Sequence, residues 1–312
     1  MFIFDGHADT LSRLYLSGQN LDDEKGHVNL DKIRQGSIGA QFFAAFVEPK
    51  FYHGLALHST MGKIDLFWRM IEQNQEILTF AGNGLDIERA KEKGLVSCLL
   101  AIEGGEALEG SLANLRLFYR LGVRLLTLTW NYRNLLGSGQ LEGEEAGGLS
   151  LFGREVVHEM NRLGMLIDVS HLNDVGFWDV LQLSSKPVIA SHSNSRALRD
   201  HKRNLTDEQI KTLADGGGVI GVNFYPDFLT GEKQASIYHV LDHVDHLVKV
   251  GGVNCVALGS DFDGVDSLPD GLEDCSKTQN LIPLLEQRGY KSEVISKIMG
   301  ENLLRVCHEV LN

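Results

Sequence analysis

The sequence predicts a (β/α)8 barrel, the TIM-barrel class of α/β folds. Three observations predict it: eight short apolar runs, helix-like segments between most of them, and a length that suits one such barrel. The chain has 312 residues, of which 43% are hydrophobic, which is enough for one large core. We therefore predict a single catalytic domain over residues 1–312, with a doubly wound open sheet as the alternative fold.

Each apolar run ends in small or polar residues and is rich in β-branched side chains. Continuous runs of this length indicate strands that are buried on both faces, as in a parallel sheet. The eight predicted strands are residues 2–9, 38–47, 95–103, 123–130, 165–171, 187–192, 219–225 and 255–263.

Two connections are longer than a barrel requires, residues 48–93 after the second strand and residues 132–149 after the fourth. Long excursions that follow barrel strands usually cover or shape an active site. We therefore expect both excursions to lie at the active-site end.

Helix-boundary residues mark the connections between strands. Residues 149–163 have helix periodicity, with Ser150 at the N-cap and Gly164 just beyond the last turn. Thr206 and Gln209 have the spacing of a capping box, which predicts a helix start. Strands that alternate with helices favour the barrel.

Composition excludes several classes of function. The chain has 42 acidic against 29 basic residues and no basic run, so we expect no nucleic-acid partner. It has no apolar stretch of about 18 residues for a membrane span, and no basic segment followed by an apolar one at its start, as a secretory signal would have. Its four cysteines are scattered without a CxxC spacing, which fits reduced thiols. We expect a cytoplasmic protein without a membrane partner.

Ionisable residues stand at the ends of five predicted strands. In a parallel barrel, the carboxyl ends of all strands open on one face, where active sites are built. The strand period of two puts His7 and Asp9 on the same side. The residues at the five ends are His7 and Asp9, Glu103, Asp168 and His171, His192, and Asp261 and Asp263.

Imidazole and carboxylate ligands without cysteine suit zinc or a related divalent ion in a catalytic site. Five ligands exceed one tetrahedral zinc, so we predict two metals that share a carboxylate and a hydroxide. Glu103 is the expected bridge, because it stands alone on its strand. Each histidine taken singly is more often structural. His243 and His246 also share a helix face, but they lie mid-helix, and we expect no metal there.

Nine segments of the chain, taken together and in order, form a specific pattern. They are DGHAD at 5–9, IEGG at 102–105, LLTLTW at 125–130, LGMLIDVSH at 163–171, PVIASHS at 187–193, KRN at 202–204, VNFY at 222–225, GSDFDGV at 259–265 and ENLLRV at 301–306. With them the chain resembles the membrane (renal-type) dipeptidases, peptidase family M19, which are binuclear zinc (β/α)8 enzymes. The resemblance runs over essentially the whole chain, and it looks like that of a cytoplasmic microbial member.

The resemblance implies a set of metal ligands. His7 and Asp9 would hold one Zn²⁺, His171 and His192 would hold the other, and Glu103 would bridge both.

The resemblance also implies roles for three further residues. Asp261 would orient and deprotonate the bridging water, and would then protonate the leaving amine. Arg203 would bind the terminal carboxylate of the substrate through a bidentate pair. Asp168 would support the site by accepting the N–H of a ligand imidazole.

The chain departs from the family beside this site. After LTLT, where the mammalian members have a histidine that helps to bind the scissile carbonyl oxygen, it has Trp130 followed by Asn131. An indole cannot titrate near pH 7, so Asn131 or the second zinc could take over that contact. Phe46, Tyr225 and Trp130 are expected either to line the substrate pockets or to pack in the core.

The resemblance thus implies a zinc-dependent dipeptidase that uses a hydroxide bridging two metals. Its substrates would be dipeptides, including L-Xaa-D-Xaa, and the family suggests a homodimer. The alternative is a metal-dependent amidohydrolase that acts on N-acyl amino acids, lactams or cyclic amides with the same metals. A non-catalytic scaffold is the least favoured hypothesis, because every ligand position is filled.

Overall fold

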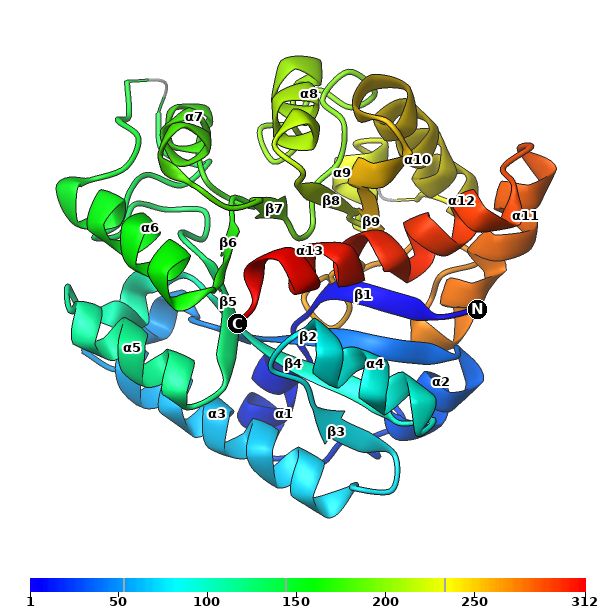
Figure 1. Ribbon diagram of the computed structural model, residues 1–312, viewed down its shortest axis with the longest axis horizontal. Helices are drawn as coiled ribbons and strands as arrows, with labels where there is room; N and C mark the ends of the chain where they lie inside the picture. The colour runs from blue at the N-terminus through cyan, green and yellow to red at the C-terminus, as the bar shows by residue number, and fades with distance from the viewer. Residues whose placement is uncertain (53, 144, 233) are drawn as a thin grey trace.

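The computed structural model describes residues 1–52, 54–143, 145–232 and 234–312. In this described part, eight parallel strands form a closed barrel in the order β2-β1-β9-β8-β7-β6-β5-β4, and pairing of β2 with β4 closes it (Figure 1). Each strand lies within one of the predicted runs, so the (β/α)8 barrel is confirmed and the open sheet is wrong. The strands are β1 (Ile3–Ala8), β2 (Ile38–Phe46), β4 (Val96–Glu103), β5 (Val123–Thr127), β6 (Leu166–Asp168), β7 (Ile189–Ala190), β8 (Val219–Val222) and β9 (Val256–Leu258).

A ninth strand, β3 (Leu78–Phe80), lies outside the barrel and was not predicted. It pairs with the first part of β4, from Val96 to Cys98, whereas β5 pairs with β4 from Leu100 onward. Three residues are too few for a periodicity to appear in the sequence.

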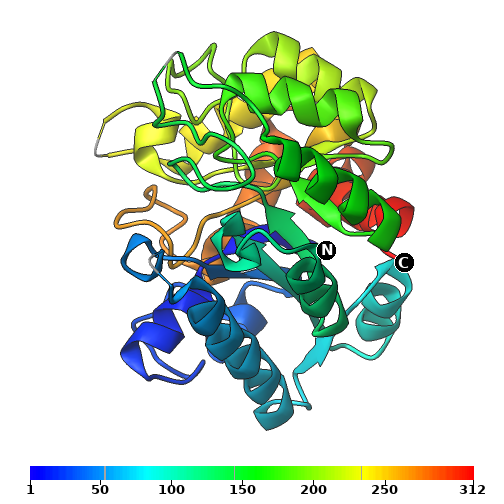
Figure 2. The ribbon, with the colours of Figure 1, turned by 90° about the vertical axis from the view of Figure 1, so that its left-hand side faces the viewer.

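Helices surround the barrel (Figures 1 and 2). They are α1 (Thr10–Ser17), α2 (Leu30–Gln35), α3 (Ala56–Gln73), α4 (Gly84–Glu92), α5 (Leu112–Arg120), α6 (Leu151–Leu163), α7 (Asp174–Leu183), α8 (Asp207–Asp215), α9 (Pro226–Leu229), α10 (Ile237–Gly251), α11 (Leu281–Gln287), α12 (Ser292–Ser296) and α13 (Asn302–Val310). Short 3-10 helices are η1 (Pro49–Phe51), η2 (Gly105–Leu108), η3 (Val253–Cys255) and η4 (Cys275–Asn280), and η5 (Lys297–Glu301) is a π-helix turn.

The predicted helix boundaries are confirmed. Ser150 caps α6 by accepting a hydrogen bond from the backbone N–H of Gly153, and Gly164 ends this helix with φ of 73°. That left-handed conformation favours glycine. Thr206 and Gln209 form the capping box of α8.

The C-terminal helix α13 closes the N-terminal end of the barrel. In Figure 1 it crosses in front of the strands. Its apolar side chains Leu303, Val306 and Val310 share a buried cluster with strand residues that fill the barrel. These strand residues include Phe4, Phe42, Leu99, Leu125, Leu166, Ile189 and Val219. Because one end is closed by this packing, the barrel interior opens at the carboxyl ends of the strands.

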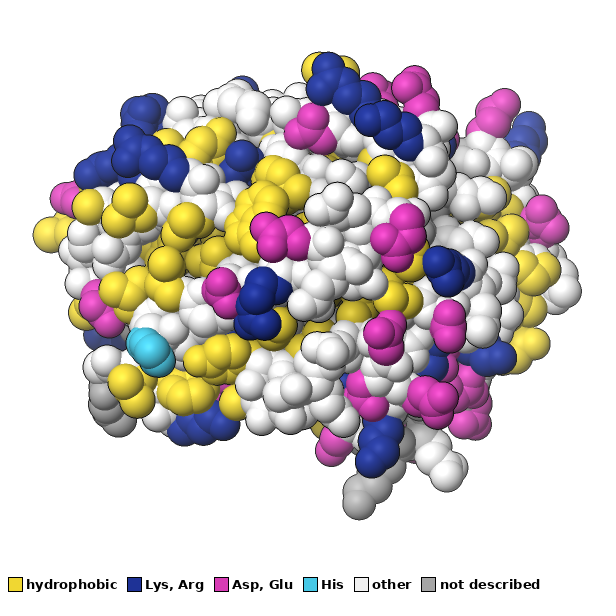
Figure 3. Space-filling view, turned by 90° about the horizontal axis from the view of Figure 1, so that it is seen from below, with side chains coloured by type: hydrophobic (Ala, Val, Ile, Leu, Met, Phe, Trp, Pro, Cys, Tyr) yellow, Lys and Arg dark blue, Asp and Glu magenta, His cyan; other side chains and the backbone are white. Residues whose placement is uncertain are grey.

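The loops at the open end lie away from the chain termini. Figure 2 shows the loops that follow β2 and β9 on one side and the two termini on the other. The face seen in Figure 3 carries hydrophobic side chains interspersed with both acidic and basic ones. None of the helices in the described part of the chain combines the length and the hydropathy needed to span a bilayer.

Candidate active site

A cavity of about 800 Å³ lies at the carboxyl ends of the barrel strands. Eight of the predicted site residues line it: Asp9, Phe46, Glu103, Trp130, Asn131, His171, Tyr225 and Asp261. The other three, His7, His192 and Arg203, are almost completely buried at 1%, 0% and 4% exposure. All eleven belong to the same end of the barrel, where the strand-end argument placed His7, Asp9, Glu103, His171, His192 and Asp261.

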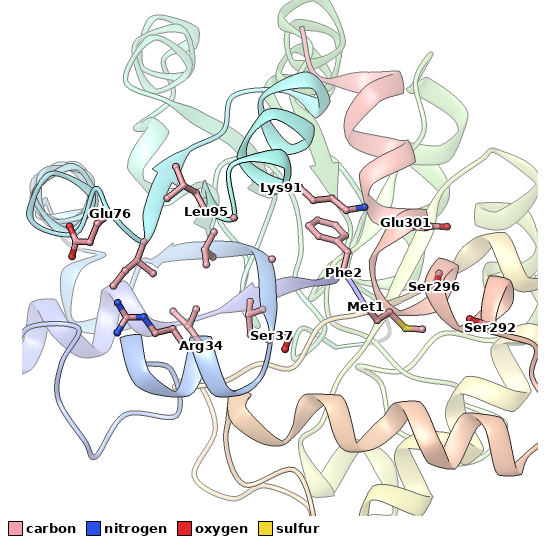
Figure 4. Close-up of a pocket in the computed structure, with 16 residues that line it drawn as sticks. Met1, Phe2, Arg34, Ser37, Glu76, Lys91, Leu95, Ser292, Ser296 and Glu301 are labelled. Carbon is pink, nitrogen blue, oxygen red and sulfur yellow. The ribbon is translucent and has the colours of Figure 1, made fainter.

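A second cavity, of about 880 Å³, lies near the opposite end of the barrel (Figure 4). It is lined by the first residues of the chain and by the starts of β2 and β4. The ammonium of Lys91 lies 4.9 Å from the centre of the Phe2 ring there. Among the described residues that line this cavity there is no histidine, whereas the groups of described residues that could hold a metal ion lie at the first cavity.

The five predicted ligands come together around the carboxylate of Glu103. Its Oε2 lies 3.4 Å from Nε2 of His7, and its Oε1 lies 3.0 Å from Nε2 of His171 and 3.6 Å from Nε2 of His192. Asp9 Oδ2 lies 3.4 Å from Nε2 of His7. The two oxygens of Glu103 therefore face two different groups of side chains.

The chemistry of this cluster fits divalent cations. Both ring nitrogens of His7 and Oδ1 of Asp9 are buried, and none has a hydrogen-bond partner in the described part of the chain. The Nε2 atoms of His171 and His192 lie 2.9 Å apart, although a neutral imidazole has only one N–H to share. Buried polar atoms normally have a partner. A cation between these nitrogens and oxygens would supply it.

Electrostatics among these side chains also favour a cation. Burial, together with the charge of Asp9, raises the pKa of Glu103 to about 7. Burial likewise raises the pKa of Asp261. Burial opposes a charge on His7, but the carboxylates of Glu103 and Asp9 outweigh it and hold the His7 pKa well above its ordinary value. Carboxylates this close repel one another, and bound metal ions would relieve the repulsion.

Two polar side chains orient His171 and His192, the histidines near Oε1 of Glu103. Nδ1 of His171 lies 2.7 Å from Oδ1 of Asn131, and Nδ1 of His192 lies 2.7 Å from Oγ of Ser191. Burial lowers the pKa of both histidines well below the ordinary value. Each ring is therefore neutral, and with Nδ1 donating, its Nε2 is free to bind a metal.

The contacts of Asp168 differ from the prediction. It does not accept an N–H from an imidazole in the described structure. Its Oδ2 instead accepts hydrogen bonds from Ser191 Oγ and Thr127 Oγ1, each at 2.6 Å. Asp168 ends β6, and the hydroxyl of Ser191 lies between it and His192. Asp168 therefore supports the His192 ring indirectly, through the hydroxyl of Ser191.

Asp261 follows β9 and lies beside His7 and Asp9. Its Oδ1 lies 3.9 Å from Nε2 of His7, and its Oδ2 accepts a hydrogen bond of 2.9 Å from Nδ2 of Asn223. Its φ of 65° is left-handed, and His171 (φ 67°) shares this conformation. Such backbone strain in residues other than glycine clusters at functional sites.

Arg203 lies in the loop after β7, and its guanidinium lies against the ring of Phe228. Its Nη2 donates to the carbonyl of His192 at 3.1 Å, and the guanidinium carbon lies 5.3 Å from the centre of the Phe228 ring. Nε is buried and has no hydrogen-bond partner in the described structure. Burial lowers the Arg203 pKa to about 10, so the group remains a cation at neutral pH. A buried cation with a free donor can receive a carboxylate.

His243 and His246 have hydrogen-bond partners on other segments of the chain. Nδ1 of His243 accepts from the backbone N–H of Ser195 at 3.1 Å, and its Nε2 lies 3.1 Å from the carbonyl oxygen of Leu229. Nε2 of His246 lies 2.7 Å from Oδ1 of Asp207. His243 thereby ties α10 to the loop that carries Arg203.

The aromatic side chains form part of the cavity wall. The Phe46 and Trp130 rings lie 5.2 Å apart, and Trp130 lies 6.1 Å from the His171 ring. Tyr225 packs edge-on against Phe228 at 5.0 Å. Phe46, Trp130 and Tyr225 therefore lie where they can contact a substrate.

The two long excursions contribute fewer residues to the cavity than predicted. Of residues 48–93 and 132–149, only Glu48 lines the cavity in the described part of the chain. Most of the first excursion is α3, β3 and α4, which pack outside the barrel. Glu48 itself was missed, and so was its partner Lys63, because no sequence signal distinguishes a buried lysine on an amphipathic helix from a solvated one.

Comparison with known proteins identifies the family. The model of the membrane dipeptidases, peptidase family M19, matches residues 1–312. The chain belongs to this family.

Relatives of this M19 member are dipeptidases by name. An uncharacterised dipeptidase of Schizosaccharomyces pombe, C965.12, is 39% identical over 97% of this chain and 79% of its own length. Dipeptidase tcpJ of Claviceps purpurea is 38% identical over 98% of this chain and 76% of its own length.

Solved structures of the family have the same fold. The crystal structure of dipeptidase AC, an M19 metallopeptidase, superposes with a TM-score of 0.94 at 30% identity, over 100% of this chain and 99% of that one. A Rhodobacter sphaeroides metallopeptidase, bound to a phosphinate mimic of L-Ala-D-Ala, gives 0.93 at 29% identity over 99% of both chains. This M19 member is thus a hydrolase of the metallo-dipeptidase type.

Proposed function

We propose that this protein hydrolyses dipeptides with two divalent metal ions, of which zinc is the expected one. The observation that carries the proposal is the position of Glu103, whose two oxygens face separate ligand groups. His7 and Asp9 would hold one ion, and His171 and His192 the other, with Glu103 shared. Imidazole and carboxylate donors without sulfur suit a catalytic zinc site.

A residue of the protein itself would transfer the proton in this reaction. When bound, the metal ions supply a water of lowered pKa and polarise the scissile carbonyl. Asp261, whose Oδ1 faces the cluster and whose Oδ2 is held by Asn223, would take the proton from the attacking water. It would then give that proton to the nitrogen of the leaving amine as the peptide bond breaks.

Arg203 would select substrates that end one residue beyond the scissile bond. Its free Nε and its cationic charge suit a terminal carboxylate. The phosphinate mimic of L-Ala-D-Ala bound by the Rhodobacter relative supports L-Xaa-D-Xaa dipeptides as substrates here. Both curated relatives are named dipeptidases, which favours peptides over the N-acyl amino acids or cyclic amides of the alternative.

The decisive experiment is steady-state hydrolysis of matched L-Xaa-L-Xaa, L-Xaa-D-Xaa and N-acyl amino acid substrates. Metal content is measured on the same sample. We expect dipeptide turnover with about two metals per chain. Turnover of the N-acyl amino acids alone would refute the dipeptidase proposal while keeping the metal site.

Three further expectations belong to this proposal. We propose one domain over residues 1–312, because the first strand pairs inside the barrel and the last helix closes it. The four cysteines are buried and unpaired, which supports a reducing, cytoplasmic location. A homodimer follows from the family resemblance, and light scattering on the purified protein would test it.

A further inference from the structure

A buried ion pair stands in the wall of the active-site cavity. Lys63 on α3 has 0% exposure, and its Nζ lies 2.5 Å from Oε2 of Glu48. The same ammonium donates to the carbonyl of Phe46 and, at 3.2 Å, to Oγ of Ser59. Three fixed contacts hold this lysine, so Glu48 is held in one place through its Oε2.

The other oxygen of Glu48 is unused. Oε1 is buried and has no hydrogen-bond partner in the part of the chain that the structure describes. The side chain is 11% exposed, and the residue lines the cavity. Leaving a buried carboxylate oxygen without a donor costs free energy. A ligand that enters the cavity with an N–H donor would satisfy it.

The other carboxylates that line the cavity are engaged or solvated. Asp9, Glu103 and Asp261 belong to the proposed metal cluster. Asp263 accepts hydrogen bonds from Thr10 Oγ1 and from the backbone N–H of His27, each at 2.7 Å. Asp266 is exposed to solvent. Among the described residues of the cavity wall, Glu48 is thus the buried carboxylate that has a free oxygen and lies outside the cluster.

Glu48 and Arg203 occupy opposite sides of the barrel mouth. Glu48 follows β2, and Arg203 lies in the loop after β7. In the closed order of eight strands, β2 and β7 are four strands apart in either direction. A buried anion with a free acceptor and a buried cation with a free donor therefore stand on opposite sides of the barrel mouth. A zwitterionic dipeptide carries the complementary pair of charges at its two ends.

We propose that Glu48, positioned by Lys63, binds the α-ammonium group of the substrate. This inference rests on the proposed dipeptidase function and specifies its substrate class, dipeptides with a free amino terminus. Arg203 and Glu48 together would then bind the two charged ends of the substrate. An N-acylated substrate would leave Glu48 without a cation and would place an apolar acyl group against a charged oxygen.

The first test uses the metal-loaded wild-type protein and two substrates that differ only in the amino group. They are L-Ala-L-Ala and its desamino analogue, propionyl-L-Ala. We expect kcat/KM for the analogue to be lower by about 10- to 100-fold, the range for one hydrogen bond to a charged group. Equal values for the two substrates would overturn the inference and leave the dipeptidase proposal intact. Absence of dipeptide turnover would overturn the dipeptidase proposal itself.

The second test assigns the effect to the residue. In Glu48→Gln, kcat/KM for L-Ala-L-Ala falls by about 10- to 100-fold, mostly through KM, while kcat/KM for propionyl-L-Ala changes less than about 3-fold. The matched control is Asp266→Asn, which removes an exposed carboxylate of the same cavity and changes neither substrate by more than about 3-fold. An equal loss on both substrates in Glu48→Gln would indicate a purely structural role and would overturn the inference.

A paired variant covers the case in which Glu48→Gln fails to fold. That change leaves Lys63 buried without its counter-ion, which is strongly destabilising. Glu48→Gln with Lys63→Met removes both charges. Calorimetric binding of a phosphinate dipeptide mimic and of its desamino form then reads out the subsite directly. We expect the wild type to prefer the amino form and the double variant to lose that preference. An unchanged preference would overturn the assignment.

Discussion

Oδ1 of Asn131 lies 2.7 Å from Nδ1 of His171. The residue that follows Trp130 therefore holds a predicted metal ligand and has its carbonyl oxygen already engaged. A scissile carbonyl oxygen accepts a hydrogen bond, so only the amide nitrogen of Asn131 could take over the contact of the family histidine, and that expectation stays a prediction. An amide that accepts from Nδ1–H keeps Nε2 of His171 directed at Glu103, 3.0 Å away.

Replacing Asn131 by Leu should weaken metal binding by about 10- to 100-fold, because His171 loses the contact that orients its ring. Competition with a chelator measures the change. Asn131→Asp keeps an acceptor at the same place and should restore most of the affinity. Tyr132→Phe, an exposed neighbour, is the control. Unchanged metal affinity in Asn131→Leu would contradict the role of this contact.

Asp261→Asn should retain both metals and lose about 10²- to 10⁴-fold in kcat, the usual contribution of a general acid–base group. The amide can keep a hydrogen bond with Asn223 but cannot carry a proton between water and amine. Metal analysis and steady-state kinetics on one sample separate the two effects. Turnover near wild type would refute the role of Asp261.

Arg203→Lys should raise KM for dipeptides, because an ammonium cannot reproduce the bidentate geometry of a guanidinium. We expect kcat/KM to fall by about 10- to 100-fold. Dipeptide amides, which lack the terminal carboxylate, should be poor substrates of the wild type and should be nearly insensitive to the substitution. If the variant lost the same factor on both substrates, the carboxylate assignment would be wrong.

An ion-pair network on the outer helices should make stability depend on pH. Glu159 on α6 contacts Arg162 at 2.7 Å and Arg116 of α5 at 3.0 Å. The hydrogen bond from Arg162 is the main reason that the Glu159 pKa is lowered to about 2. A carboxylate with a lowered pKa stabilises the fold above its ordinary value of 4.5, and this contribution is lost as the pH falls toward 2.

Glu159→Gln should therefore reduce the free energy of unfolding at pH 7 by about 1 kcal/mol, since such surface networks are partly screened by solvent. The difference from wild type should shrink as the pH is lowered from 5 to 3. Urea unfolding at each pH measures it, with Glu155→Gln, an exposed position of the same helix, as the control. A difference that stays constant with pH would show that charge is not its cause.

Much of the fold was predictable because strands and helices have local causes. Eight apolar runs predicted the barrel strands, and capping residues predicted the ends of α6 and the start of α8. The short strand β3 was missed, because three residues have no readable period.

The contacts between distant side chains could not be predicted. The path from Asp168 through Ser191 to His192 joins β6 to the end of β7. The Glu48–Lys63 pair joins the end of β2 to α3. Periodicity tells which face of an element a residue occupies, and it carries no information about which atoms of another element it will meet.

The sequence by itself determined that these histidines and carboxylates would gather at one end of the molecule. The reason is geometric, because parallel strands in a barrel deliver all their carboxyl ends to the same face. Only the tertiary structure decided which oxygen of Glu103 faces which imidazole, and which buried polar atoms were left free for a ligand. Those relationships depend on close packing between segments far apart in the chain, as between His7 and Asp261, where a shift of about 1 Å changes the hydrogen-bond partner.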